Sequence, residues 1–168
     1  MSIATRLLPL SCLLAAALCA CAPAPIYKTS GPALAATPLS VAQSPERYAN
    51  AEVIWGGRIV QVRNFADRSE IEVLAYALDS SQRPKASDVG SGRFIAQMNG
   101  YVEPLNYPAG ALMTVAGTLD GSRAGKVGEA DYVFPLVRVS QSHVWTAAEM
   151  GKGRNNVRFG VGLGVGIR

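Results

Sequence analysis

The sequence predicts a mainly β domain in which five strands close into a small OB-like barrel, preceded by one short N-terminal helix. Five segments rich in β-branched and aromatic residues are separated by clusters of Gly, Pro, Asn, Asp and Ser, the pattern of consecutive short strands. A Gly56-Gly57 pair lies inside the first segment, as expected where a strand bulges or bends sharply. Because five strands are few for two packed sheets, a flat sandwich is the less favoured alternative.

Each predicted strand has its own local signal. The second segment alternates strictly, so Glu70 and Glu72 share one face, which we expect to be the wet face of the strand rather than an acid–base pair. Pro135 lies inside the last segment and indicates an edge or a bulge. The predicted strands are residues 53–63, 69–78, 92–99, 112–119 and 131–145. Turn signals separate them at residues 64–68, 80–91, 100–110 and 120–130.

The beginning of the chain has the layout of an export signal. Arg6 is its single charged residue, and an apolar run follows over residues 7–18 before small residues take over. A run of twelve residues is too short to cross about 30 Å of hydrocarbon as a helix. We therefore expect residues 1–20 to be a signal peptide.

Residues 18–21 read Leu-Cys-Ala-Cys, similar to a bacterial lipobox, which has Leu three positions before the acylated Cys and a small residue just before it. Cleavage is then expected between Ala20 and Cys21, with the lipid on Cys21. Each buried CH₂ of the acyl chains contributes about 0.8 kcal/mol, enough to hold a folded domain on a bilayer. Ala22, where an Asp would favour the inner membrane, favours the outer membrane. The alternative is an ordinary secretory signal that leaves Cys21 as a free thiol.

Composition divides the remaining chain into three parts. Five of the ten prolines lie in residues 21–45, which we therefore expect to form an extended tether. Within it, Ser44-Pro45 is typical of a helix start and predicts the short helix, which would end near Asn50. The barrel domain is expected over residues 46–146, and a basic, Gly-rich tail over residues 147–168.

The tail alternates apolar residues with glycine from Phe159 to Ile167. As a strand it would have one apolar face, which could pair at a sheet edge, pack on a membrane or associate with a second copy through residues 157–168. A flexible, Gly-rich end is the alternative.

The excess of positive charge also lies in the tail. The formal net charge is +4, yet residues 46–146 hold ten Lys or Arg against eleven Asp or Glu. An anionic lipid surface or the phosphates of lipopolysaccharide are suitable counterparts for the tail, and a solvated tail with no partner is the alternative. Because the predicted barrel has no basic footprint, we do not expect it to bind nucleic acid.

The motifs of common catalytic and cofactor sites are missing from the sequence. His143 is the one histidine, and we expect it to pack, since no nucleophile motif accompanies it. No cysteine follows Cys21, which argues against a Cys- and His-based metal site. We therefore expect no enzyme activity, no cofactor and no metal. Five aromatic residues are expected to pack in the core and turns rather than to line a groove: Phe94, Tyr101, Tyr107, Tyr132 and Phe134.

Six segments of the chain, taken with the lipobox, are similar to a known family. They are WGGRIVQVRN (55–64), IEVLAYALDSSQRP (71–84), GRF (92–94), GYVEPLNYPAG (100–110), VAGTLDG (115–121) and GKVGEADYVFPLV (125–137). Together they resemble the Slp family of carbon-starvation-inducible outer-membrane lipoproteins. The resemblance implies a lipid-anchored outer-membrane domain without enzyme activity, and it carries over Cys21 as the functional residue.

We therefore predict an outer-membrane lipoprotein, anchored by acylated Cys21, with a non-catalytic structural or envelope-stress role. The alternative is an OB-like module that binds an envelope glycan, peptide or protein. That alternative rests on the predicted fold, because an OB-like barrel offers its longer connections for binding.

Overall fold

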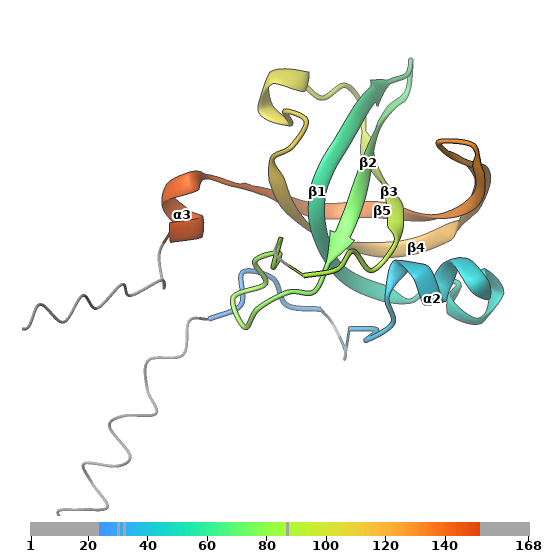
Figure 1. Ribbon diagram of the computed structural model, residues 1–168, viewed down its shortest axis with the longest axis horizontal. Helices are drawn as coiled ribbons and strands as arrows, with labels where there is room; N and C mark the ends of the chain where they lie inside the picture. Colours follow the sequence, from blue (N-terminus) through green and yellow to red (C-terminus); the bar gives the residue numbers. More distant parts are fainter. Residues whose placement is uncertain (1–23, 30, 32, 87, 152–168) are drawn as a thin grey trace, which may run out of the picture.

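The computed structural model describes residues 24–29, 31, 33–86 and 88–151, which form a five-stranded barrel with short helices (Figure 1). The predicted signal peptide and residues 152–168 of the predicted tail lie outside the described residues. All five predicted strands are confirmed. They are β1 (Glu52–Asn64), β2 (Arg68–Tyr76), β3 (Arg93–Asn99), β4 (Leu112–Val127) and β5 (Ala130–Trp145).

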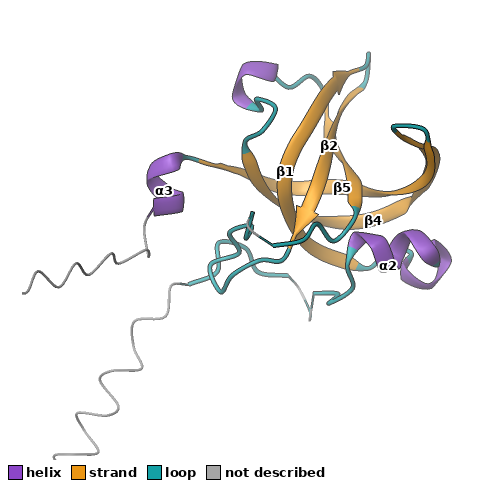
Figure 2. Cartoon of the chain, viewed as in Figure 1, coloured by secondary structure: helices purple, strands orange, loops and turns teal. Residues whose placement is uncertain are grey.

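The strands pair in the order β1-β2-β3-β5-β4, and β4 pairs back onto β1 to close the barrel (Figure 2). Every neighbouring pair is antiparallel except β3 and β5, which run parallel. This closure pairs every strand on both sides and gives an OB-like barrel. The predicted fold class is confirmed, and the sandwich alternative is not formed.

The Gly56-Gly57 pair marks the place where β1 passes from one neighbour to the other. The bulge predicted at these glycines is wrong, because both pair in register and the shift in β1 lies between Ile59 and Gln61. Residues 52–58 of β1 pair with β4, whereas residues 56–64 pair with β2, so the two ladders overlap at the glycines. A Cβ built on Gly57 would lie 1.9 Å from the main-chain oxygen of Leu74. The absence of a side chain is therefore what lets the strands approach so closely.

The predicted turn over residues 120–130 is wrong, because β4 continues to Val127. Gly121, with a φ of +85°, lies in a register shift between β4 and β5. The turn-like residues 120–121 lie within this shift and do not reverse the chain. Pairing between β4 and β5 then resumes and continues until the chain reverses at residues 128–129. Of the two alternatives predicted from Pro135, an edge or a bulge, the structure forms the bulge, since Pro135 lies at this same shift.

Among the described residues before the barrel are two short helices, α2 (Pro38–Gln43) and the 3₁₀ helix η2 (Pro45–Tyr48). The predicted helix start at Pro45 is confirmed, although the element is a single 3₁₀ turn. The sequence analysis misses α2, which lies within residues 21–45. Its start has the same kind of signal, because Thr37 caps the helix and a proline follows. Val41 of α2 is 1% exposed and joins the barrel core.

Two further short helices follow strands of the barrel. The 3₁₀ helix η3 (Pro104–Asn106) lies between β3 and β4, and α3 (Ala147–Gly151) follows β5. Within the part of the chain that the structure describes, no helix has the length and apolar character needed to cross a bilayer.

The barrel encloses an apolar core. Trp55 and Phe94 meet edge to face inside it, with ring centroids 5.3 Å apart. The indole N–H of Trp55 donates to the Ala36 carbonyl at 2.9 Å, which fixes the segment before α2 against β1. The core residues are Val41, Val53, Trp55, Ile59, Ile71, Val73, Ala75, Phe94, Ala96, Met113, Val115, Leu119 and Val137.

Candidate functional site

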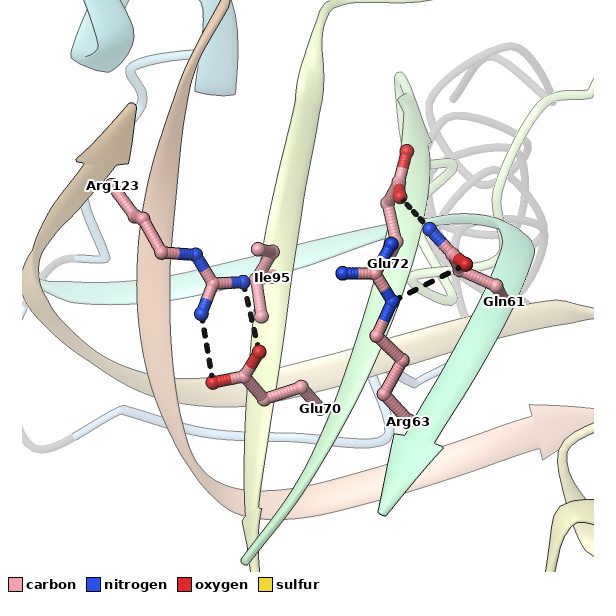
Figure 3. Close-up of a pocket in the computed structure, with 6 residues that line it drawn as sticks. All are labelled: Gln61, Arg63, Glu70, Glu72, Ile95 and Arg123. Atoms are coloured by element: carbon pink, nitrogen blue, oxygen red, sulfur yellow. Dashed lines mark hydrogen bonds and ion pairs between the residues drawn. The ribbon is translucent and has the colours of Figure 1, made fainter. Parts of the chain in front are cut away.

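The β4–β5 hairpin extends beyond the barrel and folds back over the outer faces of β1, β2 and β3, where it encloses a polar groove. The Tyr132 hydroxyl of β5 accepts from the main-chain N–H of Arg93 at 2.7 Å and donates to the Arg93 carbonyl at 3.2 Å. Arg123 of β4 points across the groove to Glu70 of β2 (Figure 3). Both strands of the hairpin are therefore fastened to the barrel.

Glu70 lies beneath this contact and is only 3% exposed. Its carboxylate accepts two hydrogen bonds from Arg123, from Nη1 to Oε1 at 3.1 Å and from Nη2 to Oε2 at 2.8 Å. The Nε of Arg68 donates to the same carboxylate at 3.2 Å. Bidentate, charge-assisted hydrogen bonds are among the strong ones in proteins, so Glu70 is the main attachment point of the hairpin.

Two opposed effects set the protonation of Glu70. Burial would raise the pKa of the carboxyl group, because it disfavours the charged form. The hydrogen bonds from Arg123 and Arg68, together with the positive charge of Arg123, outweigh burial and hold the pKa of Glu70 below its ordinary value. Glu70 is therefore ionised at neutral pH and serves as a fixed acceptor.

Glu72 is the second acid of the groove, and its carboxylate is also occupied. Arg93 donates from Nη1 to Oε1 at 2.6 Å, and Gln61 donates from Nε2 to Oε2 at 2.5 Å. The predicted wet face of β2 is wrong, because the side chains of Glu70 and Glu72 are only 3% and 13% exposed. Their alternation correctly places them outside the barrel, but the hairpin covers that outer face.

An open groove of about 210 Å³ remains beside these ion pairs. It is lined by three cationic side chains and one carboxylate, with one aromatic ring among them. The lining residues are Gln61, Arg63, Glu72, Ile95, Arg123, Ala124, Gly125, Lys126 and Phe134. Of the aromatic residues predicted to pack, Phe94 does so in the core, and Phe134 packs edge to face on Tyr132 while it also lines this groove. The prediction is wrong for Tyr101, which is 67% exposed.

Arg63 differs from the other cations of the groove. Arg123 is bound to Glu70, and the Nζ of Lys126 lies 3.2 Å from a carboxylate oxygen of Asp131. Among the residues that the structure describes, no carboxylate lies within ion-pair distance of Arg63, whose Nε makes a long hydrogen bond of 3.4 Å to Gln61. The planar guanidinium of an exposed arginine is suited to a carboxylate or phosphate, so the groove can accept one anionic group.

The sequence model of the outer membrane lipoprotein Slp family matches residues 17–160. The chain belongs to the Slp family. It is 28% identical to the outer membrane protein Slp of Escherichia coli (strain K12) over 144 residues, which cover 86% of this chain and 75% of that protein. It is 32% identical to the E. coli lipoprotein YeaY over 105 residues, which cover 62% of this chain and 54% of YeaY.

A protein of Haemophilus influenzae (strain ATCC 51907 / DSM 11121 / KW20 / Rd) is 39% identical over 92 residues, which cover 54% of this chain and 50% of that protein. The chain thus spans about half the length of YeaY and of the Haemophilus protein. No solved structure matches the chain. Membership of the Slp family supports a location at the outer membrane or in the cell envelope.

The predicted lipidation and cleavage residues, Cys21 and Ala20, lie outside the described residues but inside the range matched by the Slp family. His143 is described, and it packs. Its ring meets Trp145 edge to face, with centroids 4.5 Å apart, and its Nε2 lies 3.1 Å from Glu149 of α3. The sequence analysis misses Arg63 and Arg123 as groove residues.

Proposed function

We propose that this Slp-family protein is held on the outer membrane by acyl chains on Cys21 and has a non-catalytic structural or envelope-stress role. The observation that carries the proposal is the Leu-Cys-Ala-Cys run at residues 18–21, which lies in the range matched by the family. A non-catalytic role is supported by the groove, where arginines occupy the carboxylates of both Glu70 and Glu72.

Replacing Cys21 by Ser removes the thiol that would carry the lipid. We expect wild-type protein extracted from membranes to begin at Cys21 and to carry acyl mass, and Cys21→Ser to lose both the acyl mass and the membrane retention. Intact-mass spectrometry measures the difference. Cys19→Ser is the matched control, since Cys19 would leave with the signal peptide. An acyl-free wild-type protein would overturn the proposal.

A second function is favoured by the unneutralised charge of Arg63. We propose that the groove binds one anionic group of an envelope glycan, peptide or protein. Its volume of about 210 Å³ lies below the roughly 300–1,000 Å³ of pockets that hold drug-sized ligands, which suits a single charged group on a larger partner. The location on the outer face of an OB-like barrel adds an analogy of fold.

Arg63→Gln is expected to weaken binding of a phosphorylated glucosamine disaccharide about tenfold, because a charge-assisted contact of about 1.4 kcal/mol is lost. Titration calorimetry measures the change, with the same disaccharide lacking phosphate as the reference ligand. Arg47→Gln is the matched control, since Arg47 is an exposed arginine of η2 and does not line the groove. Equal binding of the two disaccharides, or an equal effect of Arg47→Gln, would contradict the proposal.

A further inference from the structure

Tyr27 is fastened to the loop between β2 and β3 by the side chain of Gln82. The main-chain N–H of Tyr27 donates to Oε1 of Gln82 at 2.7 Å, and Nε2 of Gln82 donates to the Tyr27 carbonyl at 2.9 Å. Tyr27 is 9% exposed. Gln82 has a φ of +64°, a left-handed conformation that is uncommon outside glycine. The two hydrogen bonds therefore fix the chain near its N-terminal lipidation segment to a well-defined turn.

Gln82 is in turn attached to the barrel. Its carbonyl accepts a hydrogen bond of 2.6 Å from Oγ1 of Thr114 in β4. Thr114 is 0% exposed, and its Oγ1 also accepts from the indole N–H of Trp145 in β5 at 2.9 Å. A buried, satisfied network of this kind is rigid, so the position of Tyr27 relative to the barrel is set.

The length of chain between Cys21 and Tyr27 limits how far the barrel can stand from its lipid. Six residue steps separate the two positions, and a fully extended chain covers at most about 20 Å over that length. This span is shorter than the barrel, because β1 alone is 13 residues long and extends about 40 Å along its course. An acylated Cys21 would therefore hold the end that carries Tyr27 nearer the bilayer than the end that carries the β1–β2 turn.

The end that carries Tyr27 also exposes apolar side chains. We call it the anchor end: residues 24–29, the described residues of the β2–β3 loop, and α2, which lie together on one side of the barrel (Figure 1). The main-chain N–H of Leu39 donates to the Ser91 carbonyl at 3.0 Å, which joins α2 to that loop. Ile26, Leu39 and Val89 are 41%, 46% and 92% exposed.

Charged residues at the anchor end fit a membrane surface. Lys28 and Lys85 are exposed there, with Asp88 as an exposed acid in the same loop. Two cations near an anionic leaflet add to the attraction of the exposed apolar residues, because each Lys near such a surface is worth about 1 kcal/mol.

We propose that the anchor end rests on the bilayer surface, with Ile26, Leu39 and Val89 at the boundary between headgroups and acyl chains. This inference rests on the acylated Cys21 proposed above. The opposite end, where the Asn64 side chain donates to the Val102 carbonyl at 3.0 Å, then faces away from the membrane. That end exposes Phe65 (43%), Tyr101 (67%) and Leu105 (84%), which are thereby left in water, so the position of Cys21 and not apolar exposure decides between the two ends.

The test places one environment-sensitive probe at each end of the acylated protein. The cysteines of the chain are Cys12, Cys19 and Cys21, so a cysteine introduced at Val89 or at Leu105 would be the one free thiol of the mature form. Both side chains are highly exposed, which makes Val89→Cys and Leu105→Cys a matched pair. Each is labelled with a nitrobenzoxadiazole dye and reconstituted in phosphatidylethanolamine–phosphatidylglycerol vesicles that carry a shallow spin-labelled lipid.

We expect the spin-labelled lipid to quench the dye at position 89 and reduce its emission about twofold, because interfacial side chains lie at the boundary of the acyl chains. The emission of the dye at position 105 should not change. Equal emission at the two positions, or quenching at 105 alone, would overturn the orientation. Flotation of the same vesicles tests membrane attachment independently of the orientation of the barrel. Protein that floats with an unquenched probe at 89 contradicts the orientation alone, whereas protein that does not float contradicts the anchor and the orientation together.

Discussion

Gly57→Ala is expected to destabilise the barrel by about 3 kcal/mol, at the upper end of what overpacking typically costs. The added Cβ would lie 1.9 Å from the Leu74 oxygen and 2.7 Å from the Ala75 Cα, both main-chain atoms that no rotamer change can move. Because Gly57 also pairs with Met113 of β4, a shift of β1 away from β2 disturbs the closure on both sides. Urea unfolding followed by circular dichroism measures the loss.

Gly31→Ala is the control for this substitution. A Cβ at Gly31 meets no atom within 4 Å, so the same methyl group should change the free energy of unfolding by less than about 0.5 kcal/mol. If Gly57→Ala unfolds at the same urea concentration as the wild-type protein, β1 has room at this point and the explanation of closure by close strand approach is wrong.

The barrel could be predicted from the sequence because its signals are local. The alternation around Glu70 fixes which side chains of β2 face the core, since neighbouring residues of a strand point to opposite faces. Pro135 marks a place where β5 departs from regular pairing with β4. The Gly56-Gly57 pair marks the place where β1 passes from β4 to β2. None of these signals requires knowledge of a partner far along the chain.

The groove could not be predicted in the same way. Arg123 lies 53 residues beyond Glu70, and the two meet because β4 continues through the shift at Gly121 instead of turning there. A local reading of the Asp-Gly-Ser segment at residues 120–122 favours a turn, which removes Arg123 from any strand. A prediction that lacks the extended β4–β5 hairpin leaves the side chain of Glu70 uncovered and therefore places it in solvent.

The N-terminal segment shows the same limit. Its prolines predict an extended conformation, which is a property of composition. The contact that fixes Tyr27 comes from Gln82, 55 residues away, and uses a side-chain amide that no motif distinguishes from a solvated one. The positive φ of Gln82 is a property of the folded turn, and a glutamine in the sequence does not indicate it.

Glu70→Gln is expected to lower the free energy of unfolding by about 2 kcal/mol at pH 7. Removing one partner of a buried ion pair typically costs about 3–5 kcal/mol. The cost is smaller here because Arg68 and Arg123 are each 40% exposed and can return to water, where screening weakens their attraction to Glu70. The remaining loss comes from the bidentate contact, which the neutral amide cannot reproduce.

The pH dependence of this difference identifies its cause. The pKa of Glu70 in the folded protein lies below its ordinary value of 4.5, so ionised Glu70 stabilises the fold above that pH. The contribution disappears as the pH falls through the lower, folded pKa. The difference between the wild-type protein and Glu70→Gln, measured by urea unfolding, should therefore be full at pH 7 and shrink in acid. Glu129→Gln, at an exposed residue of the hairpin turn, should differ little from wild type throughout. A Glu70→Gln difference that stays constant down to the acid range would mean that side-chain packing, and not the carboxylate charge, attaches the hairpin to the barrel.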